Sequence, residues 1–210
     1  MAVCGREGQR ERTCGIRRPS ARSGRRSSYS AQARRPEPHY IGSLKRLPEI
    51  RANTSAEIEI DPPQGVPLTL ARRAVDRSRD DEVDECRCVF DVEWPLHPNR
   101  EQAVHLAGEH GIKPAISNPC FELWLILHFE DQTGFLNTYA ADRRSRHLDG
   151  RSSKRIAAER YNAPARHRPQ RADQLTKRHV RNETQSPDDN PSSSMSALIR
   201  ALGADRPPAR

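Results

Sequence analysis

Residues 117–129, SNPCFELWLILHF, form the densest apolar stretch of a 210-residue chain whose mean hydropathy is -0.92. Its apolar run is much shorter than the roughly twenty residues that a bilayer-spanning helix needs. It also contains Glu122 and His128, which are costly to place in hydrocarbon. The stretch therefore predicts a buried helix with a polar edge and no membrane span.

Pro119 indicates where this helix should begin, because a proline ring restricts the preceding residue to extended backbone. Asn118 is then expected to cap the helix, with Pro119 as the first helical residue. Trp124 would bury the helix against a sheet. Glu122 would share a face with Asn118, although an anion in the first turn is also favoured by the helix dipole alone. His128, four residues after Trp124, lies where a histidine is more often half-buried with its hydrogen bonds satisfied than catalytic.

The flanking sequence predicts strands that alternate with helices. Runs rich in strand formers occupy residues 56–60, 85–92 and 113–117. Helical patterns occupy residues 36–50, 66–81, 98–111 and, near the end, 195–203. This alternation predicts an α/β fold with a small, mostly parallel sheet flanked by helices. The run 85–92 is the best candidate for its central strand.

Polar segments set the expected domain limits. Residues 1–35 are rich in Arg, Ser and Gly without apolar periodicity, which predicts a disordered basic leader. One domain is expected to follow over residues 36–200. Its compact part should end at about residue 135, with a more irregular helical part at about 136–200. Residues 201–210 are expected to form a disordered tail.

Charge and cysteine content suggest a partner and a compartment. The net charge of +8 favours a polyanion such as RNA or DNA, although arginine-rich composition alone also gives such a charge. The five cysteines suit no disulfide framework, and no secretory segment opens the chain. Cys86 and Cys88 are expected to be small buried side chains of a strand rather than zinc ligands. The expected compartment is the reducing cytoplasm.

Asp91 and Glu93 form a candidate metal site where run 85–92 ends. If the strand continues to Glu93, both carboxylates project from the same side. The carboxyl ends of strands are where α/β folds place their sites, and two carboxylates there can hold Mg²⁺ for a phosphate substrate. Glu122 follows the next strand, so we expect the three acids to converge on one pocket. The alternative is that acidic residues only mark the strand's exit into solvent.

The sequence also resembles a known family in three blocks. These are CVFDVEWPLHPN at residues 88–99, ISNPCFELWLILHFED at 116–131 and DNPSSSM at 189–195. The blocks are similar to those of the RloB/AbiLii-like family, which occurs with bacterial restriction and phage-defence loci. That family looks like a relative of Toprim-type nucleases, which use Mg²⁺ to cleave phosphodiesters. The resemblance covers about residues 36–200 and implies a Toprim-like nuclease acting in abortive infection.

The resemblance assigns roles to individual residues. It implies that Asp91 and Glu93 bind Mg²⁺, with Glu93 replacing the family's second aspartate. Glu122 would complete the metal shell or orient a water, and Asn118 would position a phosphate. The catalytic set that it implies consists of Glu37, Asn118, Glu122 and His128.

The front of the chain departs from the family pattern. Residues 31–40, AQARRPEPHY, keep Glu37, Pro38 and Tyr40, but Gln32 stands where the first family glutamate belongs. No apolar strand precedes it, so the Toprim-like sheet could lack its first strand. The departure leaves a second interpretation open. The chain could be a catalytically degenerate nucleic-acid-binding or regulatory subunit that works with other proteins of a restriction or abortive-infection system.

Overall fold

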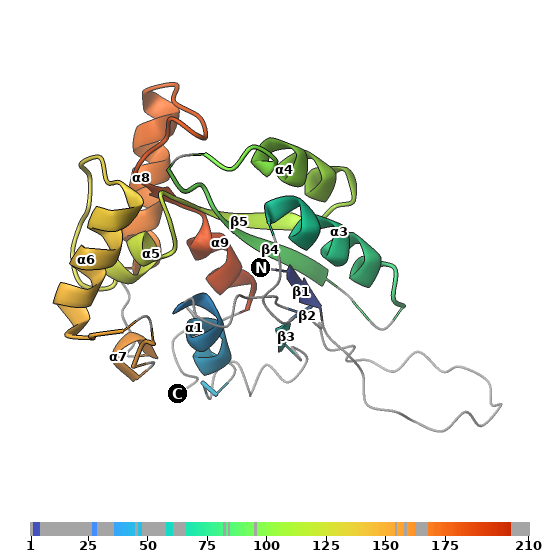
Figure 1. Cartoon of the computed structure of the whole chain (residues 1–210), viewed down its shortest axis with the longest axis horizontal. Helices are drawn as coiled ribbons and strands as arrows, with labels where there is room; N and C mark the ends of the chain where they lie inside the picture. The colour runs from blue at the N-terminus through green and yellow to red at the C-terminus, as the bar shows by residue number, and fades with distance from the viewer. Residues whose placement is uncertain are drawn as a thin grey trace.

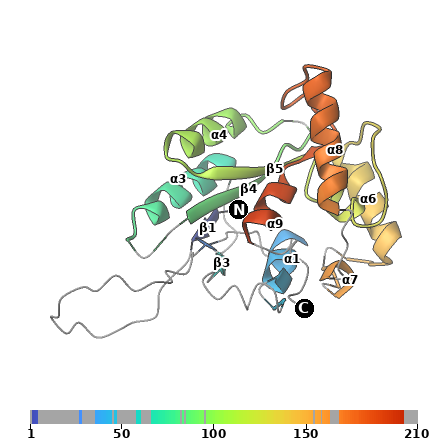
Figure 2. The same cartoon turned by 180° about the vertical axis from the view of Figure 1, so that it is seen from behind.

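The computed structural model describes residues 2–4, 27–28, 36–44, 46–47, 58–60, 66–81, 83, 85–94, 96–153, 155–157, 159–162 and 168–202. In these residues a sheet lies between helices, so the predicted α/β class is confirmed (Figure 1 and Figure 2). The predicted leader, residues 1–35, lies outside the described residues except for residues 2–4 and 27–28, which form two short strands. The predicted tail also lies outside them, apart from residues 201–202.

The sheet is mixed rather than mostly parallel. Its strands, in spatial order, are β1 (Ala2–Cys4), β3 (Ile58–Ile60), β2 (Ser27–Ser28), β4 (Glu85–Asp91), β5 (Lys113–Asn118) and β6 (Ser192–Ser193). β4 runs parallel to β2 and β5, and its parallel pairing with β5 was predicted from the sequence. β1 pairs antiparallel with β3 and β4, and β6 pairs antiparallel with β5. β1, β2 and β6 were not predicted, because two- and three-residue strands show no sequence periodicity.

The central strand β4 is buried on both faces and separates two apolar clusters. Cys86, Cys88 and Phe90 alternate along β4 and pack in one cluster. Val89 belongs to the other cluster, together with Ala115 of β5. The prediction that Cys86 and Cys88 are buried side chains of a strand is therefore confirmed.

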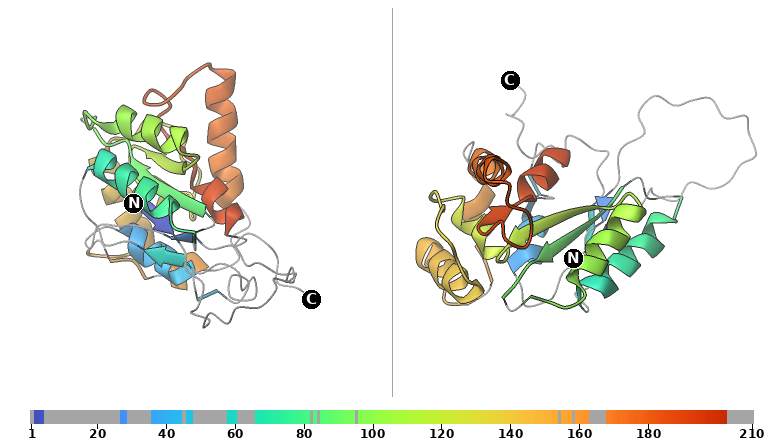
Figure 3. Two further views of the ribbon diagram at one scale, coloured as in Figure 1. Left: turned by 90° about the vertical axis from the view of Figure 1, so that its right-hand side faces the viewer. Right: turned by 90° about the horizontal axis from the view of Figure 1, so that it is seen from above.

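The helices cover the sheet on both faces and extend beyond one end. They are α1 (Pro36–Leu44), α3 (Pro67–Ser78), α4 (Arg100–Glu109), α5 (Glu122–Ile126), α6 (Thr138–Asp149), α7 (Glu159–Asn162), α8 (Arg168–Arg181) and α9 (Met195–Ala201). α3 and α4 lie side by side on one face, and α9 lies on the other (Figure 3). Among the described residues, no helix has both the length and the apolar character that crossing a bilayer requires.

α6 and α8 are more regular than the sequence predicted for the region after residue 135. The Asn137 side chain caps α6 by accepting a hydrogen bond from the Ala140 backbone N–H at 2.8 Å. Gly150 ends the helix in the left-handed conformation at φ 71°. The buried face of α6 carries Ala141, Ser145 and Asp149, which are small or polar. Because these residues give little hydrophobic periodicity, the sequence did not reveal the helix.

Candidate active site

β4 and β5 bring the predicted acids to one edge of the sheet. Asp91 is the last residue of β4, and its register partner is Ser117 of β5. One residue beyond Asp91, the Val92 N–H still donates to the Ser117 carbonyl at 3.0 Å. The Glu93 N–H then donates to the Pro119 carbonyl at 2.7 Å. This edge is the carboxyl end of both parallel strands, where α/β folds place ligand sites.

β4 ends at Asp91, so the condition for Asp91 and Glu93 to project from the same side, a strand that continues to Glu93, is not met. Glu93 has φ 54°, which is the left-handed region that extended strands never use. The hydrogen bond to Pro119 holds it in this turn. Glu93 therefore lies beside the loop between β5 and α5 rather than on the face of β4.

The charges of Asp91 and Glu122 both act on one side chain, the thiol of Cys120. Cys120 is buried, and burial raises the pKa of its thiol well above the usual value. The negative charges of Glu122 and then Asp91 raise this pKa further, and the Cys120 thiol is hydrogen-bonded to Glu122. Two carboxylates, one at a strand end and one at a helix start, thus both influence Cys120. Glu122 itself is 6% exposed.

The predicted helix start at Pro119 is wrong by three positions. α5 begins at Glu122, and Asn118 remains the last residue of β5, where it pairs with Ser192 of β6. The Asn118–Pro119 peptide bond is cis. Strand pairing on one side and side-chain hydrogen bonds on the other keep Asn118 extended, so it does not cap the helix.

Asn118 organises the site through a fully engaged side-chain amide. Its Nδ2 donates to the Pro187 carbonyl at 2.7 Å and to Oδ1 of Asp189 at 2.8 Å. Its Oδ1 accepts from Nε1 of Trp94 at 3.4 Å and from Nδ2 of Asn190 at 3.1 Å. The side chain is 0% exposed. Because both N–H bonds are engaged, Asn118 could position a phosphate only by releasing Pro187 or Asp189.

Asp189, Asn190 and Trp94 are site residues that the sequence reasoning did not single out. Asp189 also accepts a hydrogen bond from Oγ of Ser192 at 2.8 Å, which ties it to β6. The available signal was the Asn-Pro pair, because it occurs in two of the three family-like blocks, at residues 118–119 and 190–191. Both of these peptide bonds are cis, and the two asparagines contact each other.

His128 lies at the opposite end of α5 from Glu122. Six residues of helix span about 9 Å, so the two side chains leave from separate ends. Nδ1 of His128 is 2.8 Å from the Trp124 carbonyl, which can only accept, so Nδ1 carries a proton. In the neutral ring Nε2 then accepts from the Tyr40 hydroxyl at 3.4 Å. The geometry places His128 in packing rather than beside the acids.

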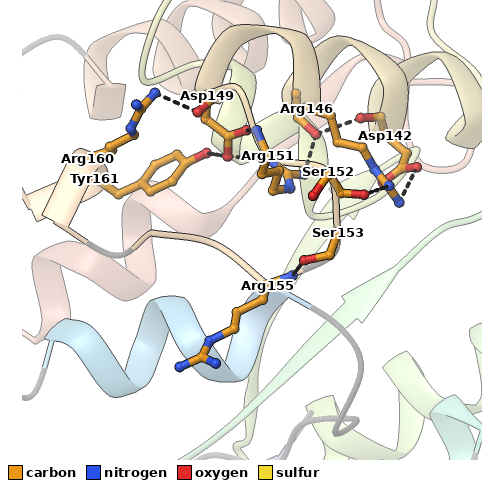
Figure 4. Close-up of polar contacts among 10 residues, drawn as sticks. Asp142, Arg146, Asp149, Arg151, Ser152, Ser153, Arg155, Arg160 and Tyr161 are labelled. Atoms are coloured by element: carbon orange, nitrogen blue, oxygen red, sulfur yellow. Dashed lines mark hydrogen bonds and ion pairs between the residues drawn. The ribbon is translucent and has the colours of Figure 1, made fainter.

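Tyr161 completes this aromatic cluster, and Figure 4 shows its hydroxyl bonded to Asp149 at the end of α6. Its ring meets His128 edge-on, with centroids 5.0 Å apart. Its hydroxyl donates to Oδ2 of Asp149 at 2.5 Å, and Asp149 forms a buried ion pair with Arg151. Burial, and then the hydrogen bond to Asp149, raise the pKa of Tyr161 above its ordinary value. The end of α6, α7 and the aromatic cluster are thereby fixed to one another.

Glu37 lies in the first turn of α1 and is 6% exposed. Tyr40, one turn later, packs on Phe121 and Trp124, with ring centroids 5.5 Å and 6.4 Å away. α1 therefore shares the core under α5. Gln32, the position of the missing family glutamate, lies outside the described residues.

Comparison with known families agrees with the sequence blocks. The sequence matches the family model of RloB-like protein over residues 31–202, which is most of the chain. The chain belongs to the RloB-like protein family. Comparison with curated proteins and with solved structures gave no match. The matched range of this RloB-like chain contains Asn118 and the 189–195 block. It also contains Asp91 and Glu122, and the sheet edge formed by these two acids is called the acid edge below.

The acid edge of this RloB-like protein can be compared with the needs of a metal ion. In the part of the chain that the structure describes, no three or more His, Cys, Asp or Glu side chains are arranged to hold a metal. Asp91 at the end of β4 and Glu122 at the start of α5 are two carboxylates whose charges both act on Cys120. Mg²⁺ commonly takes one or two protein carboxylates and completes its shell with waters and substrate phosphate. The donors present fit that mode of binding.

Proposed function

We propose that this RloB-like protein is a Mg²⁺-dependent, Toprim-like nuclease that cleaves nucleic-acid phosphodiesters at the edge formed by β4 and β5. The observation that carries the proposal is that Asp91 ends β4 and Glu122 follows β5, the parallel strand paired with β4, so that both acids belong to the carboxyl edge of this strand pair. The charges of both acids also act on Cys120. Acidic side chains gathered at the carboxyl edge of parallel strands are typical of phosphate chemistry in α/β folds.

Each residue of the edge has a role in this proposal. Asp91 and Glu122 would hold the ion, and Glu93 is close enough in the chain to contribute through bound water. When bound, Mg²⁺ would supply positive charge for the scissile phosphate and lower the pKa of an attacking water. Asn118 would keep the surrounding loops in position through its bonds to Trp94 and Asp189. The family's association implies a role in phage defence by abortive infection or restriction.

A cleavage assay with matched variants tests the proposal. Labelled RNA and DNA, single-stranded and duplex, would be incubated with the protein in Mg²⁺ or in EDTA. We expect Mg²⁺-dependent cleavage that Asp91→Asn and Glu122→Gln each reduce about 100-fold or more, the scale of losing a charge-stabilising group. Glu101→Gln is the matched control, because Glu101 is 86% exposed on α4. Cleavage that persists in EDTA, or in Asp91→Asn, would contradict the proposal.

The second candidate function is a non-catalytic nucleic-acid-binding or regulatory subunit of a restriction or abortive-infection system. The observation that favours it is Gln32, which stands where the family's first glutamate belongs. This function predicts nucleic-acid binding without cleavage by the wild-type protein. It also predicts that Gln32→Glu would be needed before Mg²⁺-dependent cleavage could appear.

A further inference from the structure

One face of α6 carries an aromatic and two basic side chains in a line. Tyr139, Arg143 and His147 are four residues apart, so they lie along the same side of the helix. Tyr139 is 73% exposed, and the Arg143 guanidinium lies over its ring, 5.9 Å from the centroid. Phe135, in the loop before α6, is 69% exposed. We call Phe135, Tyr139, Arg143 and His147 the α6 surface.

The α6 surface borders a hollow of about 470 Å³. The hollow is lined by Gln132, Leu136, Ala140, Arg143, Arg144 and His147. None of these described lining residues carries a carboxylate, and Arg144 is already held by Glu130, with Nε 2.7 Å from Oε1. Arg143 and His147 therefore set the character of the hollow. The hollow therefore suits an anion rather than a cation.

A second hollow, between α3 and α4, has a different composition. Glu101 and Glu109 line it together with Arg72 and His105, and Glu109 is 3.2 Å from the His105 ring. Because both signs of charge are present there, it gives no preference for a polyanion. The contrast makes Arg72 a suitable control for Arg143.

We infer that the α6 surface binds single-stranded nucleic acid, with bases stacked on Tyr139 and Phe135 and phosphates at Arg143 and His147. Exposed aromatic rings beside cations are how proteins hold unpaired bases and the adjoining backbone. A duplex keeps its bases stacked on each other, so only Arg143 and His147 of the α6 surface could contact it. The inference rests on the proposed function for the choice of nucleic acid, and it adds a binding site and the strandedness of the substrate.

The α6 surface is connected to the acid edge by hydrogen bonds. The Leu136 N–H donates to Oδ1 of Asn190 at 2.9 Å, and Nδ2 of Asn190 donates to the Leu136 carbonyl at 2.7 Å. The same Nδ2 donates to Asn118. The loop that carries Phe135 is therefore attached to the amide that organises the candidate active site, so a strand held on α6 would be held relative to that site.

Oligonucleotide binding by the full chain tests the inference without relying on cleavage. Fluorescence anisotropy in EDTA would measure affinity for a labelled single strand of about 15 nucleotides, as DNA and as RNA, and for the matching duplex. We expect the single strand to bind more tightly, and Tyr139→Ala to weaken its binding about tenfold. Tyr139→Phe keeps the stacking ring and should bind as the wild type does. Arg143→Ala should reduce the salt dependence by about 0.7 in log–log slope, whereas Arg72→Ala should not.

Several results would overturn the inference. The first is equal affinity for duplex and single strand, and the second is wild-type affinity in Tyr139→Ala. The third is the same salt dependence in Arg143→Ala as in Arg72→Ala. The last is no binding of any oligonucleotide. The last result would also follow if a protein partner occupied the α6 surface. Binding that depends on Tyr139 without any cleavage would leave the inference standing and remove the nuclease proposal. Cleavage that is lost in Asp91→Asn, together with binding that does not depend on Tyr139, would support the nuclease proposal and overturn the inference.

Discussion

Nδ2 of Asn190 donates a hydrogen bond of 3.1 Å to Oδ1 of Asn118, although the two residues are 72 positions apart in the sequence. Each asparagine also holds a further segment, since Asn118 binds the Trp94 indole and Asn190 binds both backbone groups of Leu136. The pair therefore fixes the loops after β4, α5 and α8 against the end of β5. Its removal should affect the whole edge at once.

Asn118→Ala should lower the free energy of unfolding by about 2–4 kcal/mol, because it leaves several buried polar partners without hydrogen bonds. Asp189 and the Pro187 carbonyl would lose a donor, and Trp94 would lose an acceptor. Urea unfolding midpoints would measure the change. Asn182→Ala, at an exposed position, should change stability by less than about 0.5 kcal/mol. Equal small effects of both variants would show that the Asn118 contacts contribute little.

Trp124→Ala should cost about 3–5 kcal/mol, the usual range for removing a large buried aromatic side chain. Trp124 is 0% exposed and packs edge-on against Tyr40 and His128. Trp94 is the natural comparison, because it is 39% exposed and its replacement should cost much less. Chemical denaturation of both variants checks the difference. A cost below about 1 kcal/mol for Trp124→Ala would place this side chain outside the core.

The sequence predicted the long, periodic elements well and the contacts between distant segments poorly. The β4 and β5 runs and the helices before and between them follow from local composition, so α1, α3, α4 and the central strand pair are as expected. Asp91 and Glu122 were placed at one edge by the rule for parallel strands, and their convergence on one Mg²⁺ pocket stays a prediction. The start of α5 was misplaced because β6, a strand of two residues, keeps Asn118 extended. No local pattern reveals such a partner.

Tyr161→Phe should remove a pH dependence from stability at alkaline pH. The folded-state pKa of Tyr161 is raised, so the unfolded chain releases the phenol proton first. The corresponding stabilisation is fully present below about pH 10, the ordinary tyrosine value, and is lost as the pH rises above it. Stability measured from about pH 9 to 11 should therefore fall less steeply in Tyr161→Phe than in the wild type.

Tyr139→Phe provides a control that removes a tyrosine hydroxyl from the surface, because Tyr139 is exposed on α6. At neutral pH, Tyr161→Phe should also cost about 1.5–3 kcal/mol, since the Asp149 carboxylate loses a buried donor. Parallel alkaline curves for the wild type and Tyr161→Phe would contradict a raised pKa at this position.

His128→Phe separates a packing role from a catalytic one. The resemblance to the family implied catalysis, whereas the structure places the ring between Tyr40, Trp124 and Tyr161, with centroids 5.0–5.5 Å away. Phenylalanine keeps the edge-on contacts and loses the hydrogen bonds to Tyr40 and to the Trp124 carbonyl. We therefore expect a loss of about 1–3 kcal/mol in stability and cleavage rates within about tenfold of the wild type.

His128→Ala, which also removes the ring, should be less stable still. Thermal denaturation and the Mg²⁺ cleavage assay, run on the same preparations, give both readings. The contradicting result would be a His128→Phe variant that keeps its stability but loses cleavage as completely as Asp91→Asn. The imidazole would then have to act in the chemistry, even though Glu122 lies at the other end of α5.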